Sequence, residues 1–209
     1  MEPHRRYGRS EVVDRAAHLL DEYGIADLTM RRLARELGLT PGALYWHFAD
    51  KQELLGAVAD RILEPADRPV ADPAWDRRIL GIGAALRDAL LSSTDGAELV
   101  SATFASGRSQ ALVRIVARLV EAAADAGFEI VNAEQAARTV VYYVLGFTAD
   151  EQSRLQWDAA GALADEQSVL NRDTSRQFAF GLQLLVDGLA VRGASTLSSG
   201  RGISQHSQG

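Results

Sequence analysis

Residues 29–48 contain two short helix-forming stretches separated by a single glycine, and this spacing leaves the chain little freedom there. Thr29 can cap the first stretch with its hydroxyl, and Gly38 suits the left-handed conformation in which helices often end. Thr40 is a second N-cap, and Pro41 then takes the first helical position, where its missing N–H is not needed. Two helices joined so closely must meet at a steep angle, which is the geometry of a helix-turn-helix unit.

Further helix signals surround this unit. Upstream, Ser10 can cap a helix with an apolar face. Downstream, Asp50 and Glu53 have capping-box spacing ahead of an apolar series that should continue to about Glu64. Residues 10–64 are therefore predicted to hold four helices in a small head.

The second short helix of the unit is too small to be stable alone, so its neighbours must hold it. Leu44 should point inward with Phe48 behind it, which leaves polar and aromatic side chains outside. A small polar and aromatic tip fits the major groove of DNA, and cations at the starts of the adjoining helices suit phosphates. The candidate DNA contacts are Arg31, Arg32, Thr40, Pro41, Gly42, Ala43, Tyr45, Trp46, His47 and Lys51.

An alternative interpretation treats Tyr45 and Trp46 as ordinary core aromatics and the arginines as a solvated surface. It fits each residue alone, whereas the joint order and spacing favour DNA binding.

Residues 10–63 resemble the DNA-binding domain of the tetracycline-repressor (TetR) family of bacterial transcriptional regulators. The resemblance is carried above all by Leu-Thr-Met-Arg-Arg-Leu-Ala-Arg-Glu-Leu-Gly-Leu-Thr-Pro-Gly-Ala-Leu-Tyr-Trp-His-Phe and by the following Asp-Lys and Leu-Leu pairs. It implies an all-helical homodimer, one helix-turn-helix per subunit, a palindromic double-stranded DNA operator, and a C-terminal domain that binds a small molecule and thereby releases the DNA.

Within the recognition helix the match to the family is partial. Tyr45, Trp46, His47 and Lys51 match residue by residue, and Trp46 is expected to be partly structural. Positions 41–43 depart from the tetracycline repressor and offer fewer hydrogen bonds to base edges, so we expect a different operator sequence.

The resemblance continues past the head, toward the ligand-binding domain of the tetracycline repressor itself. It is carried by Trp75 and by residues 89–97, 145–152 and 180–189. A histidine that helps hold magnesium with the drug in that repressor is Val100 here, and valine cannot ligate a metal. Other drug-contacting positions also differ, namely Glu64, Ile82 and Tyr142. We therefore expect neither magnesium nor tetracycline, no other metal or cofactor, and a more apolar effector.

Candidate effector contacts are the body positions that match the family's drug site and their neighbours. Ligand sites are mostly apolar with a few placed polar groups, although each of these positions also suits plain core packing. The candidates are Leu86, Leu90, Val100, Thr103, Phe104, Arg108, Tyr142, Tyr143 and Phe147.

No alternating strand pattern competes with the helical signals, so the predicted fold is all-α, with an N-terminal three-helix helix-turn-helix head and a larger C-terminal helical domain for ligand binding and dimerisation. The predicted body helices cover about 74–92, 96–104, 107–126, 133–155 and 174–192, with a loop from Gln156 to about Arg172. The predicted segments are a flexible basic arm (1–9), the DNA-binding domain (10–64), a proline-rich hinge (65–73), the ligand-binding and dimerisation domain (74–193) and a disordered tail (194–209).

The helix at 133–155 has apolar side chains around much of its circumference, more than one packing face requires. Together with residues 174–192 it is predicted to form a four-helix interface across a twofold axis, so that two heads read a palindrome. Burial inside a monomer is the alternative.

Charge and composition restrict the functional classes. The net charge is −6, and the first 63 residues carry 9 basic against 10 acidic side chains, so phosphate attraction requires the cations to be concentrated on one face and on the arm, where Arg5, Arg6 and Arg9 lie. The chain has no cysteine, four histidines, no phosphate-binding glycine loop and no paired-histidine metal motif. We expect no enzyme, although a spatial pair of Asp150 or Glu151 with a tyrosine stays open.

No signal peptide or segment of transmembrane length is apparent, which favours a cytoplasmic protein without membrane contact. The sequence thus predicts a repressor that a small apolar effector releases from a palindromic operator. A ligand-independent DNA-binding regulator, or an activator, is the alternative.

Overall fold

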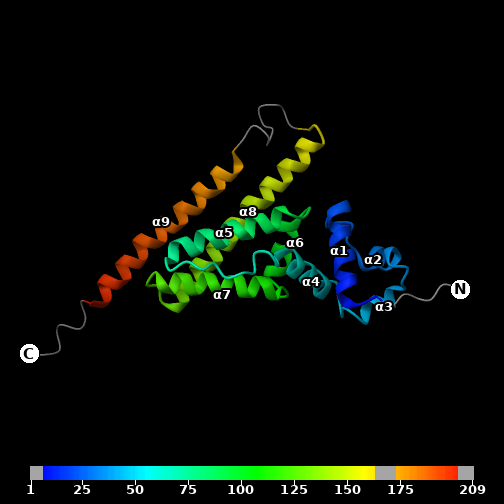
Figure 1. Ribbon diagram of the computed structural model, residues 1–209, viewed down its shortest axis with the longest axis horizontal. Helices are drawn as coiled ribbons and strands as arrows, with labels where there is room; N and C mark the ends of the chain where they lie inside the picture. Colours follow the sequence, from blue (N-terminus) through cyan, green and yellow to red (C-terminus); the bar gives the residue numbers. More distant parts are fainter. Residues whose placement is uncertain (1–6, 163–172, 202–209) are drawn as a thin grey trace, which may run out of the picture.

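The computed structural model describes residues 7–162 and 173–201, and of residues 194–201 it describes only the backbone. The described residues form α-helices and no strand, which confirms the all-α prediction. Figure 1 shows a small head at one end of an elongated helical body. The head contains α1 (Arg9–Tyr23), α2 (Met30–Glu36) and α3 (Pro41–Tyr45), and α4 (Lys51–Leu63) leads from it into the body. The body contains α5 (Trp75–Leu91), α6 (Gly96–Phe104), α7 (Gln110–Asp125), α8 (Ile130–Ala159) and α9 (Thr174–Arg201).

The helix-turn-helix unit ends and begins where the local signals place it. The Thr29 hydroxyl accepts a 3.1 Å hydrogen bond from the Arg32 amide, and the Thr40 hydroxyl accepts one of 3.3 Å from Ala43. Gly38 between the two helices has φ 64°, a conformation that glycine adopts without strain. The predicted unit is therefore confirmed at both of its caps and at its turn.

The outer helices of the head begin slightly differently from prediction. Helix α1 starts at Arg9 with Gly8 as its N-cap, so the prediction that Ser10 caps it is wrong. The Glu11 carboxylate accepts the Gly8 amide at 2.8 Å and does the capping instead. At α4 the Asp50 carboxylate accepts the Glu53 amide at 2.7 Å, as predicted.

The long body helices extend beyond their predicted ends. Helix α8 begins at Ile130, before its predicted start near residue 133, and it continues into the predicted loop as far as Ala159. Helix α9 passes through Gly193 to Arg201, so the predicted disorder is wrong for residues 194–201. Gly193 does not end the helix because it lacks the positive φ of a C-cap glycine. The rest of the predicted loop and tail, residues 163–172 and 202–209, lies outside the described residues.

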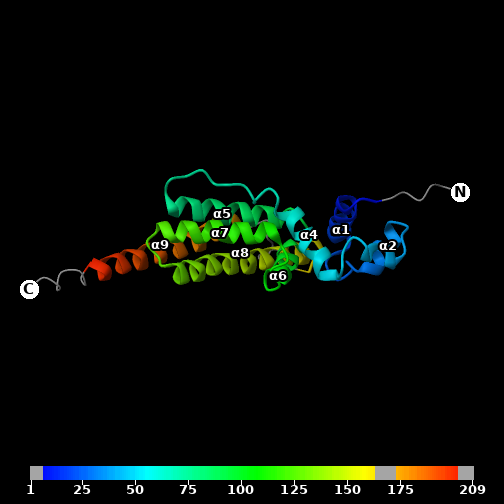
Figure 2. The same cartoon turned by 90° about the horizontal axis from the view of Figure 1, so that it is seen from below.

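The proline-rich segment 65–73 lies along the body and not between head and body. Figure 2 shows it running beside α5. Asp67 forms ion pairs of 2.6 Å with Arg114 and 2.8 Å with Arg118, both on α7. The segment is thus tied to α7, and the prediction that it is the hinge is not supported by its position. Helix α4 makes the connection instead, since it packs against α1 on one side and against α6 and α7 on the other.

Candidate nucleic-acid interface and body cavity

Helix α3 presents aromatic side chains to solvent. Tyr45 is 53% exposed and Trp46 is 91% exposed, while Leu44 and Phe48 are buried in the head core. Leu44 lies on the inner face of α3 and Phe48 lies three residues beyond its end, and both pack inward while Tyr45 and Trp46 face solvent. The interpretation of Tyr45 and Trp46 as core aromatics is wrong, and so is the expectation that Trp46 is partly structural.

Arg9 fixes the end of α3 to the start of α4. Its guanidinium donates to the His47 carbonyl, forms a 2.8 Å ion pair with Glu53 and lies 4.1 Å from the ring centre of Phe48. The Ala49 amide and Arg9 both hydrogen-bond to the Glu53 carboxylate, and together they lower its pKa. Arg9 is therefore part of the folded head, and the prediction that it belongs to a flexible arm is wrong. Arg5 and Arg6 lie outside the described residues.

The basic side chains beside α3 differ in whether they form ion pairs within the protein. Arg31 is exposed, and neither it nor Lys51 at the start of α4 forms an ion pair within the part of the chain that the structure describes. Arg32 is 19% exposed, forms a 2.6 Å ion pair with Asp27 and stacks 3.7 Å from the ring centre of Tyr23. Arg31 and Lys51 are thus available to phosphates, whereas Arg32 is held within the head.

The remaining candidate contacts form the start of α3. Thr40, Pro41 and Gly42 are exposed, and Ala43 is partly exposed. Since Gly42 and Ala43 carry almost no side chain, the backbone here can approach another surface closely. His47 is partly buried beside the exposed aromatic pair.

Helix α4 is docked on the turn between α6 and α7. One oxygen of Asp60 accepts hydrogen bonds of 2.8 Å from the Ser109 hydroxyl and from the Ala111 amide. Gly56 lies so close to this turn that a Cβ atom there would be 2.5 Å from the Arg108 carbonyl oxygen. The start of α7 and the middle of α4 are therefore in direct contact.

A second contact joins the head to the turn between α5 and α6. The Thr94 amide donates to the Asp21 carboxylate at 3.0 Å, and the Ile25 amide donates to the Asp95 carboxylate at 2.9 Å. The other oxygen of Asp95 accepts from the Gln156 side chain of α8 at 2.6 Å. The head is thus attached to the body at two places.

A cavity of about 230 Å³ lies between α6, α7 and α8. Of the predicted effector contacts, only Thr103 and Phe104 line it, and Tyr142 packs edge-on against Phe104 with ring centres 5.6 Å apart. The residues that line it are Thr103, Phe104, Gly107, Ser109, Leu112, Val113, Val116 and Arg138.

The other predicted contacts lie elsewhere. Leu86, Leu90 and Val100 fill the body core, because their helices face inward at these positions. Tyr143 and Phe147 pack with Phe178 of α9, and the Tyr143 hydroxyl donates to the Phe178 carbonyl at 2.8 Å.

Arg108 also lies away from the cavity, since it contacts Asp50 at 3.7 Å. Sequence reasoning missed the cavity residues of α7. The available signal was Ser109, whose hydroxyl caps that amphipathic helix.

The carboxylates suggested for an enzyme are paired with arginines. Glu151 is buried and binds Arg87 with two hydrogen bonds, of 2.6 and 2.9 Å. Asp150 binds Arg154 at 2.7 Å. Neither carboxylate is thus free to act with a tyrosine as a base.

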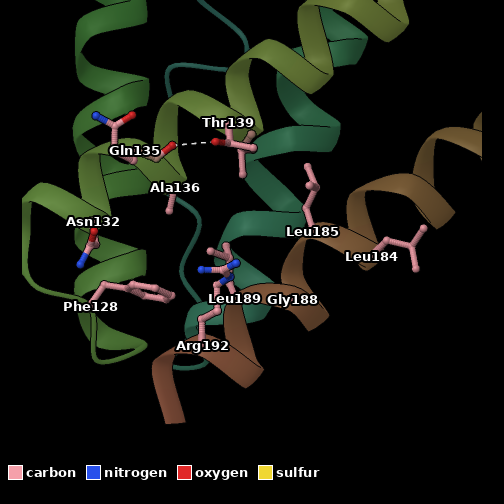
Figure 3. A pocket seen from close by; sticks show the side chains of 11 residues that line it. Phe128, Asn132, Gln135, Ala136, Thr139, Leu184, Leu185, Gly188, Leu189 and Arg192 are labelled. Atoms are coloured by element: carbon pink, nitrogen blue, oxygen red, sulfur yellow. Dashed lines mark hydrogen bonds between the residues drawn. The ribbon is translucent and has the colours of Figure 1, made fainter. Parts of the chain in front are cut away.

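Helices α8 and α9 leave an open groove of about 690 Å³ between them (Figure 3). Phe128, Asn132 and Thr139 lie on one side of it, with Leu189 and Arg192 on the other. Along α9 the apolar side chains of Phe180, Leu184 and Val191 are 66%, 55% and 71% exposed. Large apolar side chains exposed along one helix are a feature that protein interfaces share.

The described residues contain no group of three or more His, Asp or Glu side chains placed to hold a metal ion. Among the same residues, no helix combines the length and apolarity that a membrane span requires.

Comparison with known proteins gives matches over both parts of the chain. Residues 12–58 match the pattern of bacterial regulatory proteins of the tetR family, and residues 68–171 match the tetracyclin repressor-like C-terminal domain. The tetracycline repressor protein class A from transposon 1721 of Escherichia coli is 31% identical over 87% of this chain and 89% of its own.

Solved structures include similar chains. BioQ of Mycobacterium smegmatis is 63% identical with a TM-score of 0.84, over 90% of this chain and 100% of that one. A crystal structure of BioQ with its natural double-stranded DNA operator is 57% identical with a TM-score of 0.75, over 89% and 99% of the two chains.

Proposed function

The chain belongs to the tetracycline-repressor (TetR) family of bacterial regulatory proteins and is a DNA-binding transcriptional regulator rather than an enzyme, and from this premise we propose that it is a repressor which a small-molecule effector releases from a palindromic operator. The observation that carries the proposal is the exposed tip of α3. Tyr45 and Trp46 stand clear of a rigidly packed head, with Arg31 and Lys51 unpaired beside them within the described chain. A tip of this size fits a major groove.

Two heads are needed to read a palindrome, and we propose that α8 and α9 supply the interface. Both helices are long, and the groove between them together with the exposed Phe180, Leu184 and Val191 gives a surface that a second copy can cover. The regulator then works as a homodimer in the cytoplasm, where its operator DNA lies.

The effector is proposed to act through the cavity beside the turn between α6 and α7. Phe104 and Ser109 line the cavity on either side of this turn, and the turn itself contacts Gly56, Asp50 and Asp60 of α4. A ligand that prefers a different arrangement of the turn would move α4 and take the heads out of register with successive grooves. No metal or cofactor takes part in this proposal.

Footprinting on genomic fragments tests the DNA part of the proposal. The wild-type protein should protect a palindromic site, and Tyr45→Ala and Trp46→Ala should each weaken operator binding at least tenfold without changing the helical content or the oligomeric state. Trp157→Ala is the matched control, because Trp157 is an exposed aromatic residue on α8. Absence of any protected palindrome, with well-folded protein, would refute the proposal.

A further inference from the structure

The cavity between α6, α7 and α8 is lined by one charged side chain, that of Arg138, which is exposed to solvent. Arg138 donates a 2.9 Å hydrogen bond to the Tyr142 hydroxyl, and its guanidinium carbon lies 5.1 Å from the ring centre of Phe104. No carboxylate of the described residues forms an ion pair with it. Arg108 and Arg114, by contrast, each pair with an aspartate.

The side-chain hydroxyls that line the cavity already donate hydrogen bonds within the protein. The Thr103 hydroxyl donates a 2.8 Å hydrogen bond to the Val100 carbonyl within α6. The Ser109 hydroxyl donates a 2.8 Å hydrogen bond to the Asp60 carboxylate. Among the side chains that line the cavity, hydrogen-bond donation to a ligand therefore falls to Arg138. A guanidinium carries five N–H donors in one plane, and a hydrogen bond to Tyr142 occupies only one of them.

The remaining cavity wall is apolar and the space is small. Phe104, Leu112, Val113 and Val116 supply hydrocarbon surface. The volume of about 230 Å³ is below the roughly 300 to 1,000 Å³ of sites that take drug-sized ligands. A compact apolar molecule with one planar anionic group fits both features, because two parallel N–H groups of arginine match the two oxygens of a carboxylate.

We propose that the effector is a small apolar carboxylic acid, whose carboxylate pairs with Arg138 and whose hydrocarbon or aromatic part fills the space against Phe104, Leu112 and Val116. This inference rests on the proposed ligand-released regulator and names the chemical class of its ligand. The acid binds beside the turn that contacts α4, where the Arg108 carbonyl lies close to Gly56.

Calorimetry on the full chain tests the ligand class with matched probes. Benzoate, phenylacetate, hexanoate and octanoate are each compared with the primary amide of the same acid, which has nearly the same shape and no charge. At least one acid should bind at least tenfold more tightly than its amide. Arg138→Met should abolish this preference and Arg138→Lys should reduce it, while Val116→Trp, which fills the cavity, should weaken both members of the pair. Arg154→Met is the control, because this arginine also lies on α8 but pairs with Asp150.

The outcomes separate the ligand class from the proposed function when the same compounds are added to an operator complex followed by fluorescence anisotropy. If no acid is preferred over its amide, or if Arg138→Met keeps the preference, the inference is overturned. If amides release the operator as well as acids do, the inference fails and the ligand-responsive repressor stands. If acids bind through Arg138 but the operator stays bound, the ligand class holds and ligand-induced release fails.

Discussion

The Ser109 hydroxyl donates a 2.8 Å hydrogen bond to the Asp60 carboxylate, and this bond joins the start of α7 to the middle of α4. The same carboxylate oxygen accepts the Ala111 amide, which is one of the free backbone donors at the start of α7. Asp60 therefore acts as a cap for α7 that is supplied by α4. Any change in the position of the α7 N-terminus is passed to the helix that carries the head.

Replacing Asp60 with alanine should destabilise the protein. Ser109 is 1% exposed, so its hydroxyl and the Ala111 amide would lose their acceptor in a place that water reaches poorly. We expect a loss of about 2 kcal/mol in the free energy of unfolding, measured by urea denaturation. Asp150→Ala removes a carboxylate from an exposed pair with Arg154 and should change stability by less than about 0.5 kcal/mol. Equal effects of the two substitutions would contradict the capping role.

Arg31 and Arg32 should differ in their contribution to operator binding although they are neighbours. Arg31 is free to reach a phosphate, so Arg31→Ala should lower the affinity at low salt and reduce the salt dependence by about one phosphate contact. Arg32 is held by Asp27 and Tyr23, so Arg32→Ala should leave the slope of log affinity against log salt unchanged and lower the stability of the head. The measurement is operator affinity at four or more salt concentrations. A reduced slope for Arg32→Ala alone would reverse this assignment.

The exposed face of α9 should hold two copies of the chain together. Phe180→Asp places a charge in a side chain that is 66% exposed in a single chain and would be covered in the proposed dimer. Light scattering should therefore give a monomer at micromolar concentration, with operator affinity lost because one head cannot read two half-sites. Ala117→Asp is the control, since Ala117 is exposed on α7 and lines neither the groove between α8 and α9 nor the cavity. A Phe180→Asp dimer would place the interface elsewhere.

Asp67 should make the free energy of unfolding depend on pH. Burial alone would raise the pKa of this carboxyl, but its hydrogen bonds with Arg114 and Arg118 outweigh burial and lower the pKa. A carboxyl with a lowered pKa in the folded state stabilises the protein above its ordinary value of 3.8, and this stabilisation is lost as the pH falls below that value. Asp67→Asn should thus reduce stability at pH 7 and flatten its decline from about pH 4.5 to about pH 2. Urea denaturation midpoints at pH 7 and across this acid range measure both the stability at neutral pH and its decline in acid. A decline as steep as that of the wild type would show that Asp67 does not cause the loss of stability at low pH.

The head follows closely from the sequence because its signals are local. Caps at Thr29 and Thr40 and the turn at Gly38 act over three or four residues, and each forms the predicted contact. The position of Arg32 does not follow in this way, since its partner Tyr23 lies on α1 and is brought near only by packing of the head. Local helix signals also misplace the ends of α8 and α9: α8 continues to Ala159, shortly before Gly161, which has φ 65°, and α9 passes through Gly193, which lacks a positive φ.

The lining of the cavity follows even less from local sequence signals than the helix ends do. Matching positions to the drug site of the family selects Thr103 and Phe104, which line the cavity, but also Leu86 and Leu90, which fill the core. The lining from α7 depends on where that helix lies against α6, and this position is set by contacts between segments far apart in the sequence. Arg138 gains its significance only from its position at the cavity and from the absence of an ion pair with it among the described residues, which a linear sequence does not reveal.

Gly56 offers the most direct test of coupling between body and head, because no larger residue fits there. A Cβ atom at this position would lie 2.5 Å from the Arg108 carbonyl oxygen and 2.9 Å from the Arg108 Cβ atom, so Gly56→Ala must push α4 away from the turn between α6 and α7. Alanine also favours the helical state by about 1 kcal/mol, so α4 itself should remain helical. We expect operator affinity without ligand to fall at least tenfold, measured by fluorescence anisotropy, with dimerisation unchanged. Ala57→Gly weakens α4 by about 1 kcal/mol without adding a contact, and its operator affinity should stay within about twofold of wild type. Should Gly56→Ala keep full affinity, or should Ala57→Gly lose as much, the contact with Arg108 would not control the position of the head.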